Sequence, residues 1–181
     1  MTRRLAAFLW MPLAAALAQP VAQSDTVLRA LADELERSRT LRLVNLNAPY
    51  YIEYGIHHTE NFTASATLGA LNGVQKARGR LPRIQVRVGD YQFDSGNYIY
   101  SDMPLAGRYD LGSCPIDDDY LALRQYFWLG TDAAYKSALE ALARKRAAQK
   151  NLNLTEQLPD LLRIEPATLL LPWTRATVDE E

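Results

Sequence analysis

The feature that most constrains this chain is a hydrophobic period of two that begins at residue 50. Between residues 50 and 57, aromatic and β-branched side chains recur at every second position, which is typical of a half-buried β-strand. Residues 62–70, rich in Ala, Ser and Thr, and residues 83–88 follow the same period. Short connections at 59–61 and 75–82 separate these segments. The pattern therefore predicts an antiparallel meander of three strands. The alternation changes phase at Gly89, which predicts a β-bulge there.

Two segments with a period of 3.6 residues flank the predicted strands. Asp25 is a good N-cap for a helix over 25–39, and Asp117–Asp119 precede a longer helix that reaches the basic residues at 144–150. The apolar stripe of the longer helix consists of Tyr120, Leu123, Phe127, Ala134, Ala138 and Leu142, widened by Trp128, Tyr135 and Leu139. The predicted fold class is α+β, with an antiparallel β-meander packed with an N-terminal helix and one long helix.

The first residues have the three parts of a secretory signal. Arg3 and Arg4 precede an uncharged apolar run over 5–17, and Ala16-Leu17-Ala18 is a small-x-small cleavage site. We therefore expect a signal peptide over 1–18 and a periplasmic or secreted protein, with an uncleaved N-terminal anchor as the alternative. The apolar run is shorter than the ~20 residues that span a bilayer, so no stable membrane span is expected. The remaining chain divides into an α+β domain over 19–157 and an extended, proline-containing connector over 158–181.

Charge and cysteine content exclude two classes of protein. The chain has 20 Lys+Arg against 21 Asp+Glu, so it lacks the basic excess of a nucleic-acid binder. Its single cysteine cannot form a disulfide within the chain. The basic residues around 76–87 are expected to form a solvated polar face, with an acidic partner as the alternative.

Catalytic patterns are missing from the sequence. His57 and His58 are adjacent on a predicted strand, so their side chains point to opposite faces and one metal ion cannot easily bind both. Asp117–Asp119 are consecutive, whereas a calcium loop alternates its carboxylates. Cys114 has no base placed beside it and is predicted to be a small, partly buried residue. We therefore predict no catalytic, cofactor-binding or metal-binding residue within this chain.

Several separated segments nevertheless resemble, in their order, segments of a known protein family. These are residues 49–54 followed by Thr59-Glu60, and then 64–71, 85–94, 118–124 and 128–136. In this order they resemble the N-terminal region of secreted TldD/PmbA-type metallopeptidases, and the resemblance covers about residues 45–165.

The resemblance implies a protein of two parts. An N-terminal α+β part contributes to a homodimer, or a heterodimer with a sister subunit, and to the walls of a cavity that accepts peptides or unfolded segments. A C-terminal β-rich part carries a zinc-binding His-Glu-x-x-x-His motif, which this sequence does not contain. The chain is thus expected to be the non-catalytic N-terminal portion of a periplasmic zinc metallopeptidase, with zinc in the missing part. The alternative is a stand-alone periplasmic module that binds peptides or a subunit without catalysis. The sequence leaves open whether the chain is a fragment or a natural short product.

Overall fold

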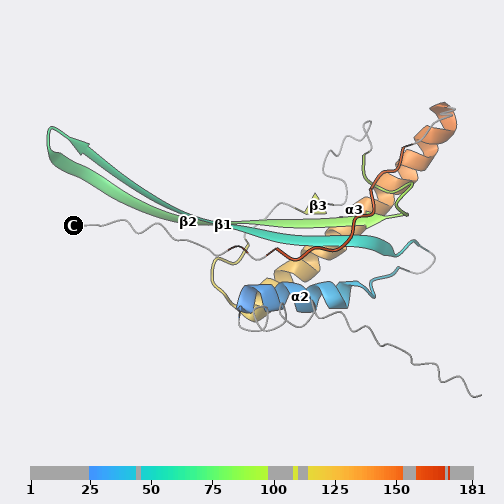
Figure 1. Cartoon of the computed structure of the whole chain (residues 1–181), viewed down its shortest axis with the longest axis horizontal. Coiled ribbons are helices and arrows are strands. Elements are labelled where there is room, and N and C mark those ends of the chain that lie inside the picture. The colour runs from blue at the N-terminus through green and yellow to red at the C-terminus, as the bar shows by residue number, and fades with distance from the viewer. Residues whose placement is uncertain are drawn as a thin grey trace, which may run out of the picture.

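A computed structural model describes residues 25–43, 46–97, 108–109, 114–152, 158–169 and 171. Its elements, in chain order, are α2 (Thr26–Ser38), β1 (Pro49–Thr67), β2 (Ala70–Val88), β3 (Arg108–Tyr109) and α3 (Tyr120–Leu152). The three strands form one antiparallel sheet in the order β1-β2-β3, and the two helices lie against one end of its long hairpin (Figure 1). The α+β class, with an N-terminal helix and one long helix, is confirmed. The predicted signal peptide lies outside the described residues.

The predicted strand boundaries were wrong. The segments 50–57 and 62–70 form one strand, β1, and the expected basic loop at 75–82 belongs to β2. The expected turn at 59–61 instead pairs with residues 77–79 of β2. Polar residues are tolerated in this stretch because both faces of the hairpin are in solvent there. The chain reverses at Leu68 and Gly69, with φ of 52° and 82°, a two-residue hairpin turn with both residues in the left-handed region.

The predicted bulge at Gly89 was also misplaced. Pro49 pairs with Val88 and Tyr51 with Arg87, so Tyr50 is the extra residue and the irregularity is on β1. Gly89 has a φ of 117° and begins a tight turn, in which the Asp90 amide donates to the Phe93 carbonyl at 3.1 Å.

The core lies where the helices cover the open end of the hairpin. Its buried side chains come from β2, α3 and α2, and they are Ile84, Val86, Val88, Phe127, Ala134, Tyr135, Ala138, Leu142 and Leu31. The predicted apolar stripe of the long helix is confirmed at these α3 positions. Trp128 was wrongly included, since half of its surface is exposed.

Acidic residues cap both helices, as predicted. Asp25 accepts a hydrogen bond from the Leu28 amide at 3.0 Å, and Asp119 accepts one from the Ala122 amide at 2.8 Å. Neither described helix is long and apolar enough to cross a membrane.

The described part of the predicted connector, residues 158–169 and 171, contains no helix or strand. Its beginning is nevertheless fixed to the domain. The Leu161 amide donates to the Tyr91 carbonyl at 3.1 Å, and Asp160 contacts α3 and the turn after β2.

Candidate functional site

The most unusual feature of the molecule is the closed end of its hairpin. We call residues 57–81 the hairpin arm. Eleven residue pairs, from His57 and Leu81 to Thr67 and Ala70, join its two strands, and apart from Arg80 at its root its residues are exposed or half-buried. At about 3.3 Å per residue the arm is about 35 Å long. Figure 1 shows it extending away from the helices and the core.

One face of the arm continues the face that packs on the core. Alternation from Tyr54 and Ile56 places His58, Glu60 and Phe62 on this face of β1. Their partners on β2 are Arg80, Arg78 and Lys76. Glu60 forms an ion pair with Arg78 at 3.1 Å, and the Lys76 ammonium lies 5.8 Å from the centre of the Phe62 ring. Charged and aromatic groups thus replace the apolar core residues along this face.

Beyond the pair of His57 and Leu81 at its root, the opposite face of the arm is made of small or uncharged polar residues. Its cross-strand pairs are Thr59 with Gly79, Asn61 with Ala77, Thr63 with Gln75, and Ser65 with Gly73. The Thr59 hydroxyl donates to the Gly79 carbonyl at 3.3 Å. Beyond that root pair, this face carries no formal charge.

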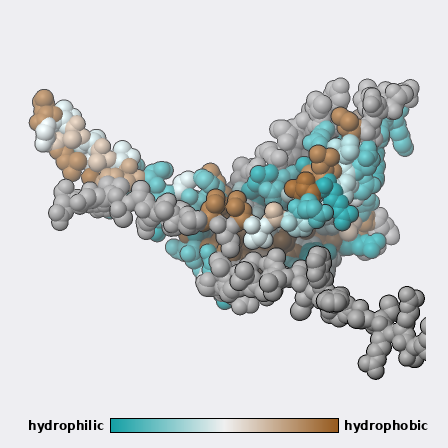
Figure 2. All heavy atoms as spheres, viewed as in Figure 1, coloured by the Kyte–Doolittle hydropathy of each residue, from teal (hydrophilic) through white to brown (hydrophobic). Residues whose placement is uncertain are grey.

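The tip of the arm is apolar. Leu68, in the turn, is fully exposed, and Leu71 and Val74 are 66% and 49% exposed. Figure 2 shows hydrophobic residues at the far end of the arm. Leu68 has a positive φ, which is unfavourable for a bulky side chain and usually belongs to Asn or Gly in such a turn. The turn therefore holds a fully exposed leucine in an unfavourable backbone conformation.

The two edges of the arm differ. The β2 edge carries Lys76, Arg78 and Arg80 and is followed by Pro82, which has no amide hydrogen. Such residues protect an edge strand from pairing. The β1 edge over 57–67 contains Glu60 as its one formal charge and no proline. Among the described residues, β1 pairs with β2 alone, whereas β2 also pairs with β3 through Ile84 and Gln85.

Arg80 fixes the root of the arm to the body. Its side chain is 4% exposed, and it donates to the carbonyls of Pro115 at 2.7 Å and Asp117 at 3.2 Å. It also forms an ion pair with Asp118 at 2.5 Å. The loop before α3 therefore holds the arm at a defined position, although the sequence predicted that this arginine lies in a solvated loop.

A buried polar cluster lies at the other end of the hairpin. The Asp94 carboxylate is fully buried, accepts from the Tyr50 hydroxyl at 2.5 Å, and forms an ion pair with Arg87 at 3.0 Å. Burial and the Asp94 hydrogen bond raise the pKa of Tyr50, so its phenol stays protonated. Lys145 and Asp160 complete the cluster. Every charge in it has a partner, which is the arrangement of a structural cluster.

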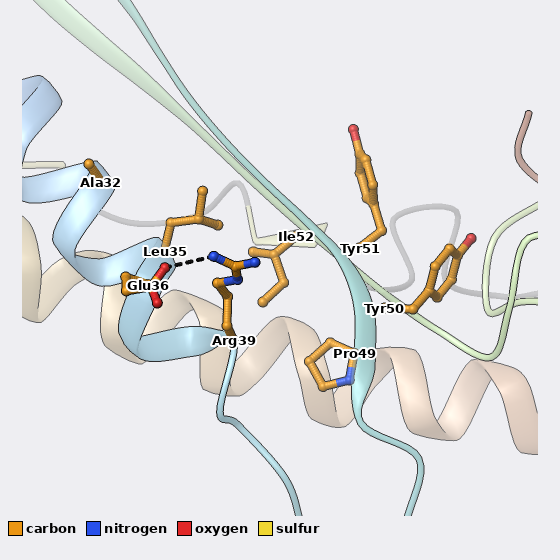
Figure 3. Close-up of a pocket in the computed structure, with 8 residues that line it drawn as sticks. All are labelled: Ala32, Leu35, Glu36, Arg39, Pro49, Tyr50, Tyr51 and Ile52. Carbon is orange, nitrogen blue, oxygen red and sulfur yellow. Dashed lines mark hydrogen bonds and ion pairs between the residues drawn. The ribbon is translucent and has the colours of Figure 1, made fainter. Parts of the chain in front are cut away.

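A shallow groove of about 430 Å³ separates α2 from the start of β1 (Figure 3). Arg39 and Glu36 on its α2 side pair with each other at 2.9 Å, and Pro49, Tyr50, Tyr51 and Ile52 form its β1 side. Both charges are exposed and satisfied, so the groove presents no group poised for catalysis.

The candidate catalytic and metal-binding residues do not lie together in the structure. His57 and His58 are both exposed on the arm, and the strand alternation places them on opposite faces. Cys114 is buried as expected, and burial raises the pKa of its thiol. Within the described ranges, no three potential metal ligands come together.

Comparisons with known proteins give no relative. No family model matches the chain, and no curated protein or solved structure matches it.

Proposed function

We propose that this chain is a non-catalytic protein-binding module and that its hairpin arm is the binding element. The observation that carries the proposal is the arm itself, with eleven residue pairs, no buried residue beyond Arg80 at its root, and a β1 edge that lacks a strand partner among the described residues. An isolated two-stranded hairpin is at best marginally stable in water. A binding partner provides the packing that the arm lacks.

Strand addition is the mode of binding that fits the arm. An extended partner strand pairs with an exposed edge through main-chain hydrogen bonds. Among the residues that the structure describes, the outer edge of β1 has no strand partner, whereas Lys76, Arg78 and Pro82 protect the β2 edge. Binding therefore depends on the main-chain groups of β1, and it requires that no bulky side chain blocks this edge.

An arm-shortened chain tests this function. Deleting residues 60–65 and 73–78 removes six paired positions from each strand. Because six is an even number, each remaining side chain stays on the same face of the hairpin. We expect the full chain to self-associate, or to bind a labelled unfolded polypeptide such as reduced, carboxymethylated α-lactalbumin in an anisotropy titration. The shortened chain should lose that binding and keep a cooperative thermal transition. A full chain with neither activity, or a shortened chain that keeps the activity, contradicts the proposal.

We also propose that this module is the N-terminal portion of a periplasmic zinc metallopeptidase acting on peptides or unfolded segments. The segments that resemble TldD/PmbA-type proteins support this proposal, as does an arm suited to extended polypeptides. Zinc then belongs to a C-terminal part. Reading the genomic DNA past codon 181 tests it. A continuing frame that encodes His-Glu-x-x-x-His supports the proposal, and a genuine stop with no such frame counts against it.

Export is tested separately. A fusion of residues 1–30 to alkaline phosphatase lacking its own signal should be active in the periplasm. An inactive, cytoplasmic fusion contradicts the periplasmic location.

A further inference from the structure

We infer that the strand partner of the arm is a second copy of this chain, and that the two β1 strands pair antiparallel about a two-fold axis close to Phe62. The inference rests on the proposed function, because it specifies the partner that the arm binds. Pairing of this kind joins two hairpins into one sheet of four strands, with β1 strands inside and β2 strands outside.

The edge asymmetry selects this arrangement. Pairing of β2 with β2 of a second copy brings the cations Lys76 and Arg78 of the two chains against each other. Pairing of β1 with β2 is head-to-tail, so each dimer keeps an open β1 edge and further copies add. Pairing of β1 with β1 is closed by its two-fold axis, and it leaves only the two protected β2 edges in solvent.

The position of Glu60 excludes one register, and the Phe62 ring favours another. With Phe62 at the two-fold axis, Glu60 faces Ala64 of the second copy and Asn61 faces Thr63 of the second copy. An axis at Glu60 instead places two carboxylates opposite each other, which destabilises a strand pair. With the axis at Phe62, no like charges face each other between the β1 strands, and the two Phe62 rings form an aromatic cross-strand pair. Each Glu60 keeps its ion pair with Arg78 of its own chain.

The apolar tip gains a contact in this register. Leu68 of one chain then lies beside Ile56 of the second copy, at the root of the opposite arm. Ile56 packs on the core described above and on a second buried cluster formed by Ala30, Cys114 and Leu123. The pairing therefore covers the fully exposed Leu68 side chain with apolar surface.

Two matched substitutions on one pair of facing residues test the inference. Thr63 on β1 and Gln75 on β2 face each other across the arm, and both are exposed. In sedimentation equilibrium of the full chain, Thr63→Lys should raise the dimer dissociation constant at least tenfold, because it places a cation in the interface near its symmetry mate. Gln75→Lys should change the constant less than about threefold, because it lies on the outer strand. Neither change should alter the thermal transition at low protein concentration, where the chain is monomeric.

A charge swap tests the register itself. Asn61→Glu combined with Thr63→Lys places each new carboxylate opposite the new ammonium of the second copy, and should restore most of the lost dimerisation. If Thr63→Lys and Gln75→Lys weaken the dimer equally, or the swap restores nothing, the β1 pairing about Phe62 is wrong. A chain that stays monomeric at 100 µM but binds unfolded polypeptide through the arm overturns this inference and leaves the proposed function intact. A chain that does neither overturns both.

Discussion

Lys145 of α3 and Asp160 of the following segment form an ion pair, with 2.5 Å between Nζ and Oδ2, although 15 residues separate them in the sequence. The two side chains are 13% and 9% exposed. The Lys145 ammonium also donates to the Gly96 carbonyl at 2.8 Å, and the Asp160 carboxylate accepts from the Asp94 amide at 2.8 Å. The pair therefore joins three parts of the chain, namely α3, the turn after β2 and the segment that follows α3.

Lys145→Met should destabilise the domain by about 3–5 kcal/mol, because it leaves a buried carboxylate without its cation. Urea unfolding followed by circular dichroism measures the change. Lys136→Met is the matched control on the same helix, since its ion pair with Asp132 has side chains 59% and 42% exposed. The control should cost no more than about 1 kcal/mol. Equal losses for the two variants would contradict a structural role for the buried pair.

The same pair shows what the sequence could not reveal. Lys145 stands in the basic run that was predicted to end the long helix, and Asp160 lies in what was predicted to be a connector. Nothing in their local patterns distinguishes them from exposed charges, because their burial depends on long-range packing. By contrast, the caps Asp25 and Asp119 and the stripe from Leu123 to Leu142 were predictable, because helix signals are local.

The hairpin arm was missed for a related reason. Thr59-Glu60-Asn61 is polar and interrupts the apolar alternation, so it resembled a turn. In the structure these residues continue β1 because residues 77–79 pair with them, and an exposed strand needs no apolar face there. The continuation of β1 through these residues is evident from the cross-strand register, and the register cannot be read from a single sequence.

Gly89 should tolerate no side chain. Its φ is 117°, and a Cβ atom there would lie 2.3 Å from the Phe93 carbonyl oxygen. Gly89→Ala should therefore cost at least about 1–3 kcal/mol in backbone strain, with steric overlap added to it. Gly73→Ala provides the comparison, because a Cβ on that arm residue meets nothing within 4 Å. The latter should be neutral or stabilising by up to about 1 kcal/mol. Thermal unfolding of both variants in parallel measures the difference, and similar melting temperatures would show that the turn at Gly89 is not as described.

Arg80 should hold the arm to the loop before α3. Arg80→Met removes the donor for the Pro115 and Asp117 carbonyls and should cost about 1–3 kcal/mol. Hydrogen exchange of residues 114–119 should accelerate at the same time. Arg78→Met, two positions away on the same face, loses an ion pair whose arginine is 63% exposed, and should cost no more than about 1 kcal/mol. Unchanged exchange at 114–119 in Arg80→Met would argue against this anchor.

Cys114 should make stability depend on alkaline pH. Burial raises the pKa of its thiol, and the nearby Arg80 lowers it to a smaller extent. The unfolded thiol ionises near its ordinary pKa of about 8.5, while the folded thiol remains protonated. The unfolded state then binds fewer protons, so the free energy of unfolding falls as the pH rises. The contribution is fully present below about pH 8.5 and is lost as the pH passes through the raised pKa of the folded protein.

Cys114→Ala isolates this effect, since Tyr50 and Tyr54, whose pKa values burial also raises, remain in both proteins. Urea midpoints under reducing conditions should fall more steeply between pH 8 and 10 for the unmodified chain than for Cys114→Ala. The two curves should run parallel between pH 6 and 8, whatever constant offset the lost sulfur atom causes. Iodoacetamide should also alkylate the folded thiol at pH 8.5 at least tenfold more slowly than the thiol in urea. Parallel curves up to pH 10, together with rapid alkylation of the folded chain, would show that the Cys114 thiol is accessible and ionises normally.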